Sequence, residues 1–119
     1  MDHPSAHPQD QAAPVEKTIR HEGRNLLTRS SGEASAQAPT IILLTGAGDT
    51  DVSWAAVRAQ LHSHANVISY DRSGMGKSDP GGERSYRGYI AELHAVVSAL
   101  STNPVVLVGH SLGGLIALC

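Results

Sequence analysis

The sequence predicts an α/β fold in which parallel strands alternate with helices. Three short aliphatic runs, at 40–45, 66–70 and 105–108, have the length and β-branched content of buried parallel strands. Two segments between them, 53–62 and 85–100, carry apolar residues at helical spacing. Because strands that alternate with helices pair in parallel through right-handed crossovers, we expect one sheet with helices packed on it.

Antiparallel pairing is expected only at the start of the domain. Residues 15–21 and 26–29 read as two strands joined by a turn at 22–25. Residues 1–14 contain three prolines and no apolar run, so we expect a flexible tail there. The folded domain is therefore expected over 15–119.

Each predicted helix has an apolar face that we expect to be buried. In 53–62 this face consists of Trp54, Val57 and Leu61. The longer helix gives the strongest periodic signal in the chain, and its apolar positions are Tyr86, Tyr89, Ile90, Leu93, Val96, Val97 and Leu100.

Composition excludes several kinds of partner. The net charge is -2 and the basic residues are scattered, so no nucleic-acid surface is expected. The apolar end of the chain is shorter than the roughly 20 residues of a membrane helix and is interrupted by glycines, so no membrane span is expected. There is one cysteine and no signal-peptide pattern, which favours a cytoplasmic location without an internal disulfide.

The most informative motif is Gly-His-Ser-Leu-Gly at 109–113, directly after the third aliphatic run. A strand that turns sharply into a helix needs residues without bulk on both sides of the turn, here Gly109 and Gly113. Ser111 would then project from the end of the sheet. A helix is expected to follow, because Leu112 begins another apolar pattern.

This order of strand, G-x-S-x-G turn and helix resembles the nucleophile elbow of the α/β-hydrolase family, of the AB hydrolase-1 type. The sequence Thr-Gly-Ala-Gly at 45–48 is similar to the family's His-Gly-x-Gly loop, with Thr45 in place of histidine. By position, the resemblance implies that the backbone N–H groups of Ala47 and Leu112 form the oxyanion hole. It also implies that Ser111 is the catalytic nucleophile.

A second stretch, 70–79, resembles the family's D-x-R-G-x-G-x-S loop, which is structural. The resemblance implies that Asp71 is a turn and hydrogen-bonding residue rather than the acid of a catalytic triad.

A phosphate-binding P-loop is the competing interpretation of Gly-Lys-Ser at 76–78. The first glycine of that motif would fall at position 71, which is Asp71, and its carboxylate would repel phosphate. Pro80 and two glycines follow where a P-loop requires a helix. Nucleotide binding is therefore not expected.

The resemblance implies an esterase- or lipase-like serine hydrolase that acts on carboxylic ester or related acyl bonds of a small molecule, without a cofactor or a metal. Serine at the elbow disfavours the dehalogenase and epoxide-hydrolase branches, which the resemblance associates with aspartate there. The esterase, lipase, peptidase and haloperoxidase-like branches stay open.

The rest of a catalytic triad is missing from these residues. In this fold the triad follows the order serine, acid, histidine, and the eight residues after Ser111 contain no Asp, Glu or His. The seven histidines all precede or adjoin the serine: His3, His7, His21, His62, His64, His94 and His110. We expect the chain alone to be inactive. The alternative is a truncated product or a non-catalytic interaction fragment derived from a hydrolase.

The resemblance also implies that the fold is incomplete after the elbow. The run 105–108 is central in the family's sheet, so here it would be an unprotected edge. We expect self-association through this strand edge.

Overall fold

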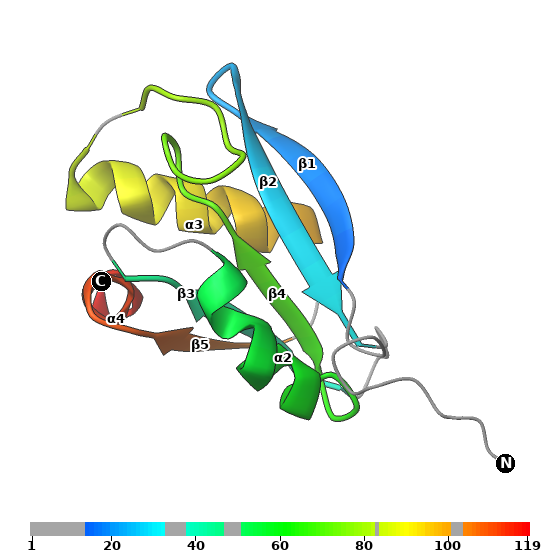
Figure 1. Ribbon diagram of the computed structural model, residues 1–119. Helices are drawn as coiled ribbons and strands as arrows, with labels where there is room; N and C mark the ends of the chain where they lie inside the picture. Colours follow the sequence, from blue (N-terminus) through cyan, green and yellow to red (C-terminus); the bar gives the residue numbers. More distant parts are fainter. Residues whose placement is uncertain (1–13, 33–37, 47–50, 83, 101–103) are drawn as a thin grey trace, which may run out of the picture.

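A five-stranded mixed sheet forms the centre of the computed structural model (Figure 1). The structure describes residues 14–32, 38–46, 51–82, 84–100 and 104–119. The strands are β1 (Val15–His21), β2 (Arg24–Ser31), β3 (Thr40–Leu44), β4 (Asn66–Tyr70) and β5 (Val105–Gly109). The helices are η1 (Asp51–Trp54), α2 (Ala55–Leu61), α3 (Tyr86–Leu100) and α4 (Leu112–Leu118). The predicted α/β fold and its order of elements are confirmed. The predicted tail lies outside the described residues, apart from Pro14.

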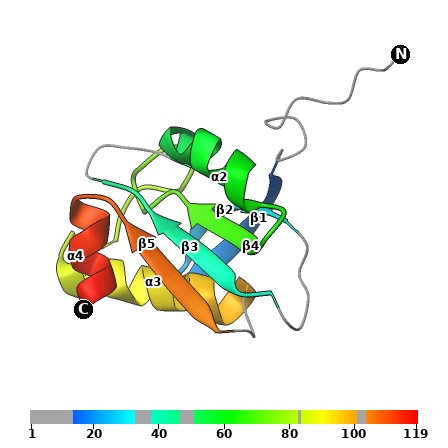
Figure 2. The same ribbon diagram turned by 90° about the horizontal axis from the view of Figure 1, so that it is seen from below.

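The strand order is β1-β2-β4-β3-β5. β1 pairs with β2, and β2 with β4, in antiparallel fashion, whereas β3 pairs in parallel with both β4 and β5. Figure 2 shows α2 on one face of the sheet and α3 and α4 on the other. β3 is central among the parallel strands, with β4 on one side and β5 on the other.

Alternation along β3 divides the core between the two faces, as the two-residue period of a strand requires. Ile42 and Leu44 belong to the larger cluster, whereas Leu43 belongs to the smaller one. The buried members of the larger cluster are Ile19, Leu26, Ile42, Leu44, Ile68, Tyr70, Leu93, Val96 and Ile116. The smaller cluster joins Leu43, Ala65 and Val67, with Trp54 and Leu61 packed against them.

The hairpin is tighter and its second strand longer than predicted. His21 pairs directly with Arg24, so the turn consists of Glu22 and Gly23 alone. β2 continues to Ser31 because its second half pairs with β4, a contact that the pattern of the hairpin does not reveal.

The predicted apolar face of the first helix is wrong in part. Val57 is exposed, whereas Trp54, in the short 3₁₀ turn η1, and Leu61 pack against the smaller cluster as predicted. The residue that α2 buries is Arg58, whose guanidinium donates to the Val67 carbonyl at 3.2 Å and to the Ser31 hydroxyl at 3.4 Å. A charged side chain can be buried when polar groups of the sheet satisfy its donors.

The predicted buried face of the longer helix is also wrong at one position. Tyr86 is 49% exposed, because it is the first residue of α3 and the helix buries residues in its middle. These buried residues are Glu92, Leu93 and Val96.

β5 lies at the edge of the sheet, as predicted, with β3 as its one strand neighbour among the described residues. Its side chains are aliphatic, and Val106 and Val108 are exposed. No helix in the described part of the chain is both long enough and apolar enough to cross a membrane.

Candidate active site

Ser111 has an unusual backbone conformation, with φ 57° and ψ -117°. It lies two residues beyond the end of β5 and directly before α4, and its side chain makes no capping hydrogen bond to that helix. The turn is closed by backbone bonds: the Gly113 N–H donates to the His110 carbonyl at 2.9 Å, and the Gly114 N–H donates to the Ser111 carbonyl at 2.9 Å. A non-glycine residue held at such angles costs on the order of 1–3 kcal/mol, and residues of this kind cluster at functional sites.

The two glycines of the motif are required by close packing. A Cβ on Gly109 would lie 2.4 Å from the Gly113 carbonyl oxygen, and a Cβ on Gly113 would lie 2.2 Å from the Leu44 carbonyl oxygen. Neither glycine has positive φ, so lack of bulk is what these positions need. The turn therefore packs tightly against itself and against the end of β3.

The loops after β3 and β5 meet at one edge of the sheet. Leu44 pairs with Gly109, and the His110 N–H donates to the Leu44 carbonyl at 3.1 Å. Of the two predicted oxyanion donors, Leu112 is the first residue of α4 and directly follows Ser111. Ala47 lies outside the described residues. The chain up to Gly46 is described.

Arg72, in the loop after β4, connects that loop to the loop after β3. Its guanidinium donates to the carbonyl oxygens of Thr45 and Gly46, both at 2.8 Å. The side chain is buried, and its Cζ lies 5.7 Å from the centre of the Tyr89 ring. Sequence reasoning did not single out this residue, although it stands inside the recognised 70–79 motif.

Asp71 is a hydrogen-bonding residue of the loop after β4, as predicted, although the turn itself begins after it. Its buried carboxylate accepts the Lys77 N–H at 3.1 Å and faces the Arg29 guanidinium at 3.4 Å. A Cβ on Gly76 would lie 2.3 Å from the Asp71 carboxylate, so the loop closes tightly over this side chain. The next described helix, α3, begins only at Tyr86, which also argues against a P-loop.

Two polar side chains, those of Glu92 and Tyr70, are buried near these loops. Glu92 on α3 accepts the Ser73 N–H at 3.2 Å and is 2% exposed. Tyr70 is also buried, and its hydroxyl has no hydrogen-bond partner among the described residues. Burial raises the pKa of Tyr70 well above its usual value, and the nearby Arg72 charge opposes this effect. Tyr70 is therefore a neutral phenol at physiological pH.

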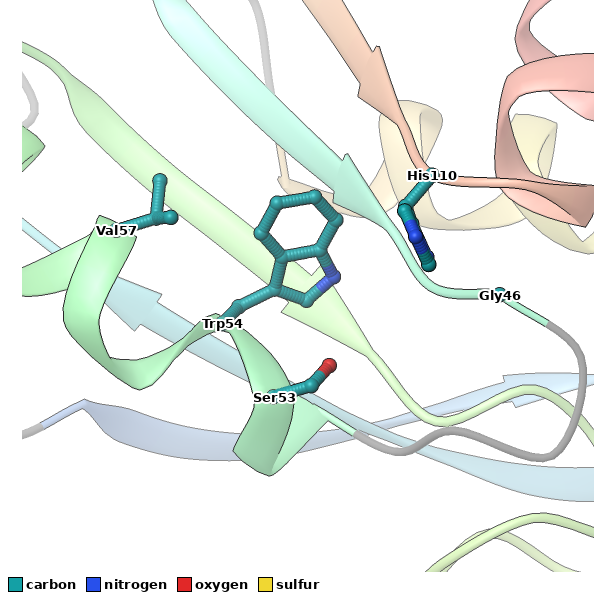
Figure 3. Close-up of a pocket in the computed structure, with 5 residues that line it drawn as sticks. All are labelled: Gly46, Ser53, Trp54, Val57 and His110. Atoms are coloured by element: carbon teal, nitrogen blue, oxygen red, sulfur yellow. The ribbon is translucent and has the colours of Figure 1, made fainter.

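A pocket of about 220 Å³ opens beside the loop after β3. Its lining residues come from the β3 end, the η1–α2 segment and the turn after β5: Gly46, Ser53, Trp54, Val57 and His110 (Figure 3). The Trp54 indole nitrogen lies on the side of the ring that faces His110, and it is buried without a hydrogen-bond partner among the described residues.

Three of the other histidines lie on the helices or at their ends. His62 is the C-cap residue of α2, His64 lies two residues further along the chain, and His94 is on α3. Within the described ranges, no cluster of three His, Cys, Asp or Glu residues could hold a metal ion.

Comparison with known proteins points to the same family as the sequence motifs. A model described as "Alpha/beta hydrolase family" matches residues 41–119. A protein of Agrobacterium fabrum named "Putative carbamate hydrolase RutD" is 36% identical over 91 residues, which are 73% of this chain and 34% of that protein. The chain thus spans about a third of the length of this relative.

Solved structures resemble the fold over most of the chain. A thioesterase domain from the curacin biosynthetic pathway superposes with a TM-score of 0.79 at 27% identity, over 88% of this chain and 40% of that one. The enol-lactonase of Burkholderia xenovorans LB400 gives 0.77 at 29% identity, over 84% and 39%. The arrangement of sheet, turn and helices, together with the family model that matches two thirds of the chain, shows that this chain belongs to the alpha/beta hydrolase family.

Proposed function

We propose that the protein is a serine hydrolase that cleaves carboxylic ester or related acyl bonds, with Ser111 as its nucleophile. The observation that carries this proposal is the backbone of Ser111, which has positive φ in a tight turn between β5 and α4. Such a turn presents a hydroxyl at the end of a sheet without burying it. The relatives support the same class of bond, since carbamates and enol-lactones are both acyl compounds.

In the proposed reaction the Ser111 Oγ attacks the carbonyl carbon and a base removes its proton. The carbonyl oxygen becomes an oxyanion that accepts hydrogen bonds from the N–H groups of Leu112 and Ala47. The intermediate collapses, the alcohol or amine leaves with a proton, and an acyl-enzyme remains. Water then releases the acid and frees Ser111.

The base and its carboxylate partner must come from outside the eight residues that follow Ser111, because those residues contain no Asp, Glu or His. Loss of the base from a serine triad costs about 10⁶ in kcat. These 119 residues by themselves are therefore expected not to turn over substrate.

Labelling with a fluorophosphonate probe tests the proposal. Two proteins are compared: the 119-residue polypeptide and the product of the complete gene that encodes these residues. We expect labelling of the complete gene product, loss of labelling in Ser111→Ala, and no labelling of the polypeptide alone. Ser98→Ala, at an exposed serine on α3, is the matched control and should label like the wild type.

Two outcomes would contradict parts of this proposal. Labelling that persists in Ser111→Ala would remove Ser111 as the nucleophile. Labelling of the polypeptide alone that depends on Ser111 would show that a base already lies within these residues.

A further inference from the structure

The two edge strands of the sheet differ in how they are protected. β1 carries the exposed charged residues Glu16, Lys17 and Arg20, and charges on an edge strand discourage another chain from pairing with it. β5, the outermost strand at the other edge, has the sequence Val-Val-Leu-Val-Gly and carries no charge (Figure 2). Val106 and Val108 are nevertheless 49% and 37% exposed. β5 therefore has the composition of a strand that pairs on both sides.

The backbone of β5 has hydrogen-bonding groups that point away from β3. The Thr40 N–H donates to the Pro104 carbonyl, and the His110 N–H donates to the Leu44 carbonyl, both at 3.1 Å. The N–H and C=O groups of successive residues in a strand point to opposite sides. Leu107 is three residues from both Pro104 and His110, so its N–H and C=O point away from β3. Among the described residues, no strand pairs with β5 on that side.

These features fit a second copy of the same strand. In an antiparallel pair centred on Leu107, this residue lies opposite its own copy, and each donates its N–H to the carbonyl of the other. Val106 then lies opposite Val108 of the second copy, so the exposed valines of the two chains pack against each other. They do so on the face of the sheet that holds Leu43, the register partner of Val108. No like charges meet in this arrangement, because β5 has none.

The other face of β5 presents an apolar groove to the same partner. The groove lies between β5 and α3 and has a volume of about 230 Å³. Its described lining residues include no Lys, Arg, Asp or Glu, and they are Leu93, His94, Val97, Ser98, Val105 and Leu107. Residues directly opposite each other in a pair have their side chains on the same face, so Leu107 of the second copy lies beside this groove. Pairing thus covers apolar surface on both faces of β5.

We propose that β5 is the dimerisation strand of this chain: it pairs in antiparallel fashion with β5 of a second copy, across a two-fold axis at Leu107, and joins two five-stranded sheets into one. A two-fold interface uses the same patch on both chains and closes at two copies. The charged outer edge of β1 opposes further growth of the joined sheet. The proposal does not depend on the chemistry of Ser111.

The test measures the mass of the 119-residue chain in solution, by light scattering after gel filtration and by sedimentation velocity. A reducing agent is present, because Cys119 is exposed and can otherwise form a disulfide between two chains. We expect twice the mass of one chain at the highest concentration. The mass should fall towards that of one chain over a roughly hundredfold dilution, since dimer formation follows mass action.

Charges placed at the two exposed valines report on the pairing and on its register. Val106→Lys combined with Val108→Lys sets lysine opposite lysine across the axis, so the dissociation constant should rise by at least about tenfold. Val106→Lys combined with Val108→Glu sets opposite charges face to face. Its dissociation constant should stay within about threefold of wild type and should rise with salt, because salt screens the attraction.

Val15→Lys is the matched control at the other edge of the sheet. Val15 is an aliphatic residue of β1 and is 71% exposed, so its replacement should leave dimerisation unchanged. Circular dichroism checks that each variant is folded.

Several results would each overturn the proposal. A single-chain mass at every concentration would mean that β5 does not pair with its copy. Wild-type affinity in the variant with lysine at both positions, or an equal loss of affinity in Val15→Lys, would place the interface elsewhere. Equal losses in the two double variants would refute the register centred on Leu107. Growth of the wild-type chain into particles without a size limit would exclude a closed two-fold pair.

Discussion

Two non-glycine residues in the described ranges have positive φ, and they are held there in different ways. Glu22 has φ 50° and is followed by Gly23 at 79°, in the two-residue turn between β1 and β2. Ser111 has φ 57° and stands between β5 and α4. Positive φ at both central residues is typical of a type I′ hairpin turn, so the conformation of Glu22 follows from local strand pairing.

The surroundings of the two turns show the difference. A Cβ on Gly23 would meet nothing within 4 Å, whereas Cβ atoms on Gly109 or Gly113 would enter backbone atoms. Glu22 and Gly23 are both exposed, so the hairpin turn is not held by packing. The turn at Ser111 is imposed by the packing of α4 against β3, so its strain is maintained by the rest of the fold.

The largest expected effect is that of Gly113→Ala. The new Cβ would lie 2.2 Å from the Leu44 carbonyl oxygen, so backbone must shift and the free energy of unfolding should fall by about 3 kcal/mol. Urea denaturation measures it. The control is Gly114→Ala, whose Cβ has its nearest neighbour at 3.6 Å and which should stabilise α4 by up to about 1 kcal/mol. Equal effects at both sites would refute the packing argument.

The next largest effect is expected for Ser111→Gly, which should gain stability where Gly113→Ala loses it. Glycine adopts positive φ without a Cβ penalty, so this variant should be more stable than Ser111→Ala by about 1 kcal/mol. Both variants should fail to react with the fluorophosphonate probe. If thermal unfolding gives the same stability for the glycine and alanine variants, the backbone at Ser111 is not strained.

Glu22→Asn should have the smallest effect. Asparagine tolerates left-handed φ better than glutamate, so the free energy of unfolding should rise by about 0.5 kcal/mol. The ion pair that Glu22 makes with Arg24, at 3.4 Å, has its carboxylate 66% exposed and contributes little. Thermal melts of the two proteins measure the difference. A loss of stability would mean that this exposed pair outweighs the turn geometry.

Local sequence patterns were sufficient to predict the order of the strands and helices and the turn at Ser111, but not every boundary. The aliphatic runs of β3, β4 and β5 and the helical spacing in α3 are each readable within one segment. The G-x-S-x-G spacing likewise indicates that small residues are required on both sides of the turn. The close approach of Gly113 to Leu44 explains this requirement.

Contacts between distant segments were not predictable in this way. Arg58 was overlooked because its partners on β2 and β4 can be identified only once the sheet order is known. The bonds from Arg72 reach 27 residues back along the chain to Thr45. The pairing of β2 with β4 was unpredictable for the same reason. Strand periodicity shows which face of a strand is buried, but not which strand lies beside it.

Trp54 gives the pocket beside the loop after β3 an optical signature. The sequence contains one tryptophan, so the indole fluorescence of these residues comes from a single place. Its ring lies in the pocket wall, and its buried nitrogen has no hydrogen-bond partner among the described residues. The emission of an indole responds to the polarity around its ring, so a change in this pocket wall alters the fluorescence of these residues. Because no second tryptophan contributes, such a change is assigned to this wall of the pocket alone.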